Sequence, residues 1–232
     1  MKKRILSILL LCCMVLTMLP TTVLAADGPM DTIPKYDVSI DVYNRTSDIS
    51  IKDSRSYYIY SSVPDKLRDT WAWDKKIFIK GDKAAPHVFI DGVNIKMSPS
   101  SKGPAIELNK KASAYLYFIG KDSSLQGADG RAAIQKNRSE GQLYVLARTG
   151  TTVTCKGGYR AAGIGGSWAI RNIGDPMFNM DMYGHGVNMH FGSQSNPDYW
   201  GGTINATGGE YGAGIGAGSW GHSGHSGNTI HG

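Results

Sequence analysis

A short motif that recurs along the chain constrains the fold more than any other feature of the sequence. Each copy is a pair of residues, mostly small, followed by isoleucine. Successive isoleucines lie 28, 30 and 51 residues apart in the copies Pro104-Ala105-Ile106, Ala132-Ala133-Ile134, Ala162-Gly163-Ile164 and Ala213-Gly214-Ile215. A period of about 20–50 residues indicates a repeat architecture whose units stack on one another. The interval of 51 residues accommodates either two units or one unit with an insertion.

The last two copies match over a longer stretch than the motif itself. Residues 157–168 align with residues 208–220, with one extra residue in the second copy. The segments that precede them also match, Thr152-Val153-Thr154-Cys155-Lys156 against Thr203-Ile204-Asn205-Ala206-Thr207. Self-similarity of this extent is a strong repeat signal.

The apolar residues favour short β-strands throughout. They form runs of three to five residues, and turn-forming residues separate many of these runs; examples are residues 38–42, 49–51, 77–79, 88–90, 93–97, 115–119, 143–146 and 152–154. No segment keeps a helical period for three turns, which indicates an all-β class. Glycine supports this interpretation, because 21 of the 30 glycines lie in the last 82 residues and each costs up to about 1 kcal/mol inside a helix.

A unit of 28–30 residues with about three short strands suits one coil of a parallel β-helix. Each strand would bury one isoleucine or valine, and glycine would serve the tight corners. Because parallel crossovers are overwhelmingly right-handed, we expect a right-handed parallel β-helix, a solenoid with about three short strands per coil. A sandwich does not require the motif at fixed intervals, and a propeller blade requires four strands and a period of about 40–50 residues.

The N-terminus has the pattern of a secretory signal peptide. Lys2-Lys3-Arg4 precedes the apolar run Ile5–Leu19, and Val23-Leu24-Ala25 supplies the small residues of a cleavage site. The run is short for a membrane span. We therefore expect residues 1–25 to be removed and the mature protein to be secreted or associated with the cell surface, without a membrane span.

Removal of that segment changes the charge and the cysteine count. It takes away three of the 25 basic residues and none of the 19 acidic ones, so the net charge becomes 22 − 19 = +3. No concentrated basic patch remains, which makes nucleic acid an unfavoured partner. Cys155 is the one cysteine left, so no disulfide can form within the mature chain.

We expect residues 26–232 to form a single β-helix domain with two departures from the regular pattern. Residues 167–199 interrupt the repeat and suggest a long loop or irregular coil. The segment Asn228-Thr229-Ile230-His231-Gly232 resembles the first strand of another coil. This favours a sequence that is truncated at its C-terminus, because an uncapped rung exposes an apolar face and a strand edge.

The repeat also carries a resemblance to known proteins. Ala-Gly-Ile-Gly-Gly at 162–166, preceded by Thr-x-Thr-x-x-Gly-Gly at 152–158, resembles the glycine-rich repeats of clostridial and gut-bacterial surface proteins. The stretch Val88–Ile95 and the following Gly103–Leu108 resemble the same group. The sequence is also similar to bacterial carbohydrate-binding β-helix domains that share the pectate-lyase architecture. The resemblance implies a right-handed β-helix, a secreted or surface location in a bacterium, and polysaccharide binding.

Aromatic residues are the candidate ligand contacts. Two tryptophans occupy matching places in the last two repeats, and further aromatic residues lie near them; the candidates are Tyr159, Trp168, Tyr199, Trp200, Tyr211 and Trp220. Aromatic rings on a stacked surface suit the apolar C–H faces of sugars. The alternative interpretation is that these amphipathic side chains cover the core at loops.

The leading hypothesis is a non-catalytic protein that binds polysaccharide or another surface glycan. A pectate-lyase-like enzyme is one alternative, and it would use acidic residues to hold calcium and a base to take a proton. The other alternative is a structural stalk or adhesin segment. The sequence shows no pair of acids that can be placed on one face and no familiar zinc signature, so we assign no catalytic residue and no metal ligand.

Overall fold

A computed structural model describes residues 33–98, 103–168, 186–193, 195–196, 198–218 and 229–230. The expected signal peptide, Trp220 and the larger part of the expected insertion lie outside the described residues. The chain from Pro34 onward forms one compact unit, and the description below concerns that unit.

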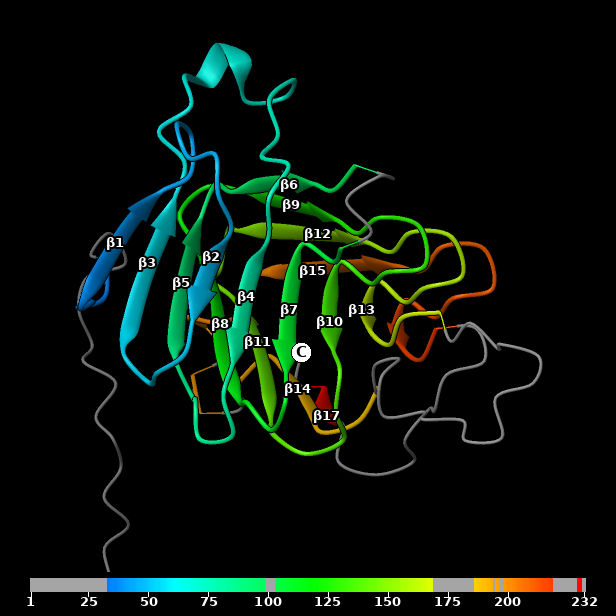
Figure 1. Ribbon diagram of the computed structural model, residues 1–232. Coiled ribbons are helices and arrows are strands. Elements are labelled where there is room, and N and C mark those ends of the chain that lie inside the picture. The colour runs from blue at the N-terminus through cyan, green and yellow to red at the C-terminus, as the bar shows by residue number, and fades with distance from the viewer. Residues whose placement is uncertain are drawn as a thin grey trace, which may run out of the picture. The chain divides into compact units, whose positions relative to one another are not determined.

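Three parallel sheets run along this unit (Figure 1). Sheet A contains, in order, β1 (Val38–Asp41), β3 (Ser56–Tyr60), β5 (His87–Asp91), β8 (Ala114–Ile119), β11 (Leu143–Ala147), β14 (Met189–Phe191) and β17 (Thr229–Ile230). Sheet B contains β2 (Ile49–Ile51), β4 (Ile77–Lys80), β7 (Ile106–Asn109), β10 (Ile134–Lys136), β13 (Ile164–Gly165) and β16 (Ile215–Gly216). Sheet C contains β6 (Asn94–Lys96), β9 (Ser123–Gln126), β12 (Thr152–Lys156) and β15 (Thr203–Thr207).

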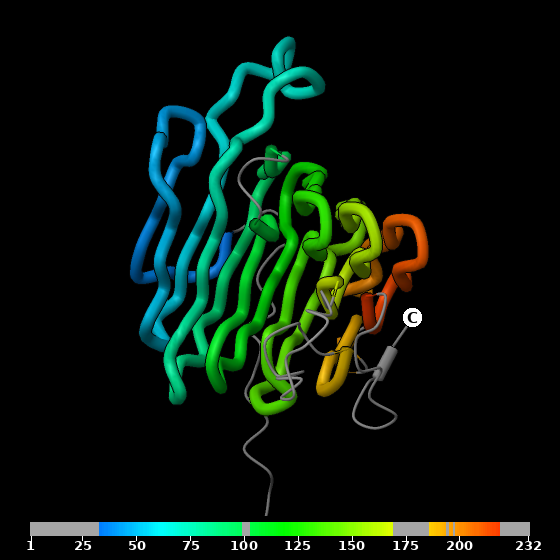
Figure 2. Tube along the Cα trace, turned by 45° about the vertical axis from the view of Figure 1, so that its right-hand side comes forward, coloured from blue at the N-terminus to red at the C-terminus, as the bar shows by residue number. Residues whose placement is uncertain are grey.

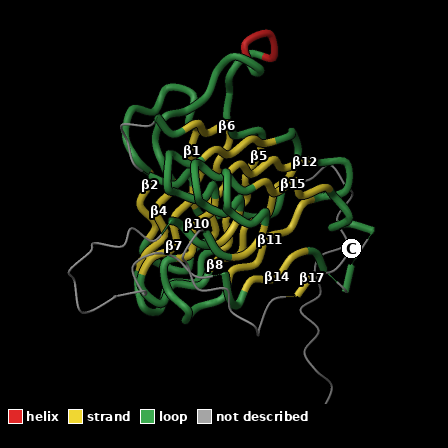
Figure 3. The backbone as a smooth tube through the Cα atoms, turned by 90° about the vertical axis from the view of Figure 1, so that its right-hand side faces the viewer, coloured by secondary structure: helices red, strands yellow, loops and turns green. Residues whose placement is uncertain are grey.

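The chain winds from sheet to sheet, and each coil adds one rung to the stack (Figures 2 and 3). The first four strands, β1 to β4, alternate between sheets A and B. From β5 onward the chain passes through β6 of sheet C and β7 of sheet B before it returns to sheet A at β8. The prediction of an all-β parallel solenoid with about three short strands per coil is confirmed.

The repeated isoleucines are in register, as their spacing indicates. Ile106, Ile134, Ile164 and Ile215 pair in sequence along sheet B. Because β13 pairs directly with β16, the interval of 51 residues is one coil with an insertion, not two coils. The matching segments of β12 and β15 pair residue for residue from Thr152–Thr203 to Lys156–Thr207. Part of the interrupting stretch 167–199 is itself regular, since Met189–Phe191 forms β14 of sheet A.

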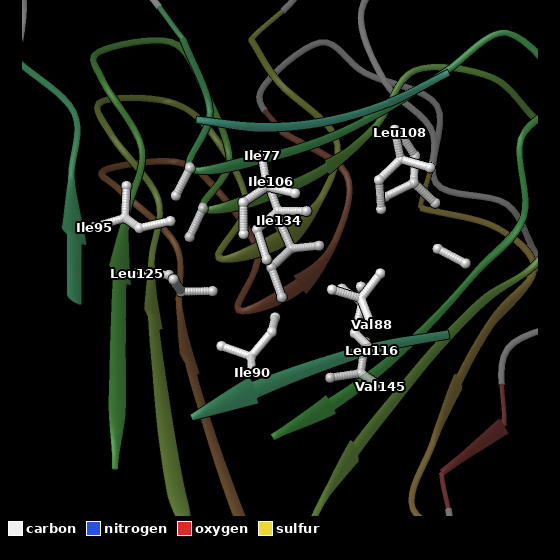
Figure 4. Packing of buried hydrophobic residues seen from close by; sticks show 14 of the residues in the cluster. Ile77, Val88, Ile90, Ile95, Ile106, Leu108, Leu116, Leu125, Ile134 and Val145 are labelled. Atoms are coloured by element: carbon white, nitrogen blue, oxygen red, sulfur yellow. The ribbon is translucent and has the colours of Figure 1, made fainter. Parts of the chain in front are cut away.

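The core is built by the inward residues of all three sheets. On each strand the side chains alternate between the two faces, and most of the inward residues are isoleucine, leucine or valine. Figure 4 shows Ile77, Ile106 and Ile134 of sheet B stacked opposite Val88, Leu116 and Val145 of sheet A. Each of these side chains is fully buried. A solenoid without disulfides is held by this column of apolar contacts and by the parallel ladders.

Lys136 is the exception among the inward residues of sheet B. It pairs with Leu108 of the previous rung and is 1% exposed. Its ammonium group donates hydrogen bonds to the backbone carbonyls of Arg138, Ser139 and Glu140. Burial lowers the pKa of Lys136 from 10.5 to about 8. All three donors are used, so this lysine closes the turn between β10 and β11.

Candidate functional site

Three of the six predicted aromatic residues come together at one corner of the solenoid. Tyr159, Trp168 and Tyr211 surround the guanidinium group of Arg160, whose carbon lies 5.0, 5.1 and 5.7 Å from their respective ring centroids. The Tyr159 and Trp168 rings meet edge to face, with centroids 6.2 Å apart. We call these four residues the corner cluster.

The backbone at the corner explains why these side chains converge. The turns that follow β9, β12 and β15 of sheet C each place one residue in the left-handed region, and this residue is Gly130, then Arg160, then Tyr211 in successive coils. Their φ angles are 74°, 60° and 64°. The coils stack there through hydrogen bonds from the Gly130 amide to the Tyr159 carbonyl and from the Arg160 amide to the Glu210 carbonyl. Equivalent turns thus bring Arg160 and Tyr211 side by side.

Two of the three rings of the corner cluster are exposed, and Trp168 is half-buried. Tyr211 is 69% exposed and Tyr159 is 40% exposed. Arg160 has no carboxylate within ion-pair distance in the described part of the chain, and its Nε atom is buried without a hydrogen-bond partner there. A guanidinium group that packs on rings keeps donors in its own plane. The corner cluster therefore offers exposed ring surface together with a cationic hydrogen-bond donor.

Tyr199 and Trp200 belong to a different surface. Trp200 contacts Tyr117 of β8 with ring centroids 5.1 Å apart, and its other neighbour is Tyr199 at 4.6 Å. The guanidinium carbon of Arg148 lies 5.3 Å from the Tyr199 ring centroid. The structure does not join these two residues to the corner cluster by any ring contact among the described residues. Trp220, the sixth candidate, lies outside the described residues.

Sequence reasoning missed the largest aromatic surface, which covers the outer face of sheet A. One row is His87, Tyr115, Tyr144 and His190, whose successive ring centroids are 4.6, 4.5 and 4.5 Å apart. The second row contains Tyr58, Phe89, Tyr117 and Trp200. We call them the stacked rows. Alternation within residues 57–60, 87–90, 115–118 and 143–145 could have revealed them, because every second residue faces outward.

In the stacked rows, the faces of the rings pack against neighbouring rings. The planes in the first row are inclined by only 3°, 6° and 17°, so each inner ring has a neighbour on both faces. Adjacent strands are about 4.8 Å apart, which is the spacing that stacked rings prefer. Solvent meets mainly ring edges, and the Tyr117 hydroxyl is 3.0 Å from Nδ1 of His87. This arrangement stabilises the sheet but leaves little ring face for a ligand.

The described residues contain no cluster of side chains that could hold a metal ion. No group of three or more histidine, cysteine, aspartate or glutamate side chains lies together among them. Cys155 lies in the inward row of sheet C, between Leu125 and Ala206. Burial raises the pKa of its thiol, which opposes formation of the nucleophilic thiolate.

Comparison with known proteins gives no relative from which a role could be transferred. No family model matches the chain, and neither the curated proteins nor the solved structures contain a match to it. Within the described part of the chain, no helix has the length and apolar character needed to cross a membrane.

Proposed function

We propose that this protein is a secreted or cell-surface β-solenoid that binds polysaccharide or another surface glycan without cleaving it. The corner cluster is the binding surface in this proposal. Secretion is supported by the signal-peptide pattern of residues 1–25. The ligand would place the apolar face of a sugar ring on Tyr159 or Tyr211, and Arg160 would donate hydrogen bonds to sugar oxygens.

One observation carries the proposal. The corner position that is glycine in one coil, Gly130, is Arg160 and Tyr211 in the next two, although all three have left-handed backbone angles. A side chain in that region costs about 1–2 kcal/mol relative to the ordinary conformation. These two residues contact each other, since the Arg160 guanidinium group packs on the Tyr211 ring as well as on Tyr159 and Trp168, and Tyr211 and Tyr159 are exposed. Strain of this kind at an exposed aromatic cluster supports a binding role.

Retardation in gels that contain polysaccharide tests the proposal. Residues 26–232 and the double variant Tyr159→Ala/Tyr211→Ala would be run through gels with plant, mucin and microbial polysaccharides. We expect at least one polysaccharide to retard the wild-type protein and the double variant to lose at least tenfold in affinity. The matched control is Tyr36→Ala, because Tyr36 is 41% exposed but stacks on Tyr58 of sheet A. This control should keep wild-type retardation.

Two results would overturn the proposal. One is normal migration of the folded wild-type protein in every gel, which would favour a structural stalk. The other is equal retardation of the wild-type protein and the double variant. Products released from a retarding polysaccharide would favour the lyase alternative, and loss of that activity on chelation would implicate calcium.

A further inference from the structure

A polar groove on another face of the molecule supports a second binding site. It lies over sheet C and has a volume of about 440 Å³. Its floor is formed by strands β6, β9 and β12, and its wall is the segment from Arg68 to Ala72, which follows the short 3-10 helix Asp65–Leu67. This segment projects from the solenoid at the top of Figures 1 and 2. All residues that line the groove are described.

The floor is a regular array of polar side chains. Asn94, Ser124 and Thr154 pair across the three strands and face outward, and Asn205 of β15 continues the row. Lys96 and Gln126 form part of a second row beside it. Neighbouring strands are about 4.8 Å apart, so a ligand along the solenoid axis meets a new hydroxyl or amide at each rung. A linear polymer with a short repeat suits such an array.

The floor has hydrogen-bonding capacity that the protein itself does not use. The Ser124 and Thr154 hydroxyls and the Gln126 amide make no side-chain hydrogen bond within the described part of the chain. In contrast, the Asn94 amide donates to the Arg68 carbonyl at 2.9 Å and its oxygen accepts from the Ser124 amide at 3.1 Å. Asn94 therefore fixes the base of the wall to the floor, and the other groups remain available to a ligand.

The wall is held in place and contributes one aromatic residue. Nη1 of Arg68 donates to the Gly92 carbonyl at 2.9 Å. Trp73, just beyond the wall, bonds through its backbone to Asn94 and Lys96 of β6. Trp71 lines the groove, is partly buried against the core, and meets Tyr43 edge to face. A preformed wall reduces the ordering that a ligand must impose on binding.

The charges of the groove indicate a neutral ligand. Its lining contains two basic residues, Arg68 and Lys96, and two acidic residues, Asp69 and Asp122. Arg68 is also near Asp65, with 3.6 Å between Nε and the carboxylate. A polyanion would meet two carboxylates without a surplus of cations to offset them. Hydroxyl and amide groups around one aromatic ring are instead suited to a polyhydroxylated ligand.

From these observations we infer that the sheet C groove binds a neutral, linear glycan that lies along the solenoid axis across β6, β9 and β12. This site uses none of the corner cluster. The inference therefore adds a second glycan-binding surface to the proposed function, and it names neutral, linear glycans as the ligand class of that surface. Its failure and that of the corner cluster can be distinguished experimentally.

The test uses calorimetric titration with neutral hexasaccharides of β-1,4-glucan, β-1,4-mannan and β-1,4-xylan, and with hexagalacturonate as the acidic comparator. Thr154→Arg would fill the groove with a long cationic side chain. Asn205→Arg is the matched control, because Asn205 is also exposed in the same outward row but does not line the groove. Circular dichroism would verify that both variants are folded.

We expect at least one neutral hexasaccharide to bind the wild-type protein and to lose at least tenfold in affinity in Thr154→Arg. Its affinity should change less than twofold in Asn205→Arg. The inference is overturned if no neutral hexasaccharide binds, if both arginine variants lose affinity equally, or if hexagalacturonate is the one ligand affected by Thr154→Arg. Loss of neutral binding in the aromatic double variant alone would support the corner cluster and reject the groove.

Discussion

The stacked rows of sheet A and the corner cluster both contain aromatic side chains, but their ring faces are covered in the stacked rows and exposed in the corner cluster. In the stacked rows, rings from successive rungs lie parallel at 4.5–4.6 Å in the first row and occupy one another's faces. In the corner cluster, rings meet edge to face around a cation, and Tyr211 remains 69% exposed. Aromatic content alone therefore does not identify a binding surface in a solenoid. Whether a ring face is free decides between stability and recognition.

The largest expected difference between the two regions concerns stability. Tyr117→Ala removes a ring that stacks on Phe89 and contacts Trp200 at a tilt of 40°, and it deletes the contact with His87. We expect the free energy of unfolding to fall by about 3 kcal/mol, as for other aromatic truncations in packed sites. Tyr159→Ala should change it by about 0.5 kcal/mol or less, as at exposed sites. Urea unfolding of both variants measures the difference, and equal losses would contradict the distinction.

Alkaline unfolding sharpens the same comparison. Burial, with a smaller effect of Tyr115, raises the pKa of Tyr117 from 10.0 to about 12. The unfolded chain therefore loses this proton at a lower pH than the folded protein. The resulting contribution to the free energy of unfolding is fully present below pH 10 and is lost between pH 10 and pH 12. Tyr117→Phe should show a smaller fall than the wild-type protein over this window in urea titrations at fixed pH. An identical fall would mean that Tyr117 is not buried as described.

A glycine at the strained corner should separate stability from binding. Tyr211→Gly restores the residue type found at the equivalent Gly130 and relieves a left-handed side chain. We expect the unfolding free energy to rise by about 1 kcal/mol while polysaccharide retardation weakens. Thermal and urea unfolding, together with affinity gels, give both values. A variant that is less stable and still binds normally would contradict the functional explanation of the strain.

The smallest predicted effect is the acid sensitivity of the first stacked row. Burial lowers the pKa of His87 below 6.5. The unfolded chain therefore binds this proton more readily than the folded protein. The contribution of neutral His87 to the free energy of unfolding is fully present above pH 6.5 and is lost as the pH falls below that value. His87→Phe keeps a ring against Tyr115 and removes the titrating group. The loss of unfolding free energy between pH 7.5 and pH 5 should be smaller in this variant, and an equal loss would exclude His87 as its source.

The architecture could be predicted from the sequence because each repeat forms one coil and the repeats recur at regular intervals. Ile106, Ile134 and Ile164 lie in register as their spacing required, and glycine-rich corners coincide with the turns between sheets. The candidate site was predicted only in part, since Tyr159, Trp168 and Tyr211 converge but Tyr199 and Trp200 do not join them.

The remaining features depend on which residues face outward and on contacts between distant segments. The stacked rows were recoverable in principle from alternation within Tyr115–Phe118 and its neighbours. The sheet C groove was not, because its wall comes from a projecting segment near Trp71 and its floor extends to Thr154. No periodic pattern links those two parts of the chain.

Tyrosine-specific NMR tests the central distinction most directly. Protein with ¹³C-labelled tyrosine rings would be titrated with a polysaccharide that retards the wild-type protein in gels, after assignment through single Tyr→Phe variants. The account predicts shifts at Tyr159 and Tyr211 and no shifts at Tyr115, Tyr117 or Tyr144 of the stacked rows. Shifts confined to the stacked rows would contradict it and would place recognition on the outer face of sheet A.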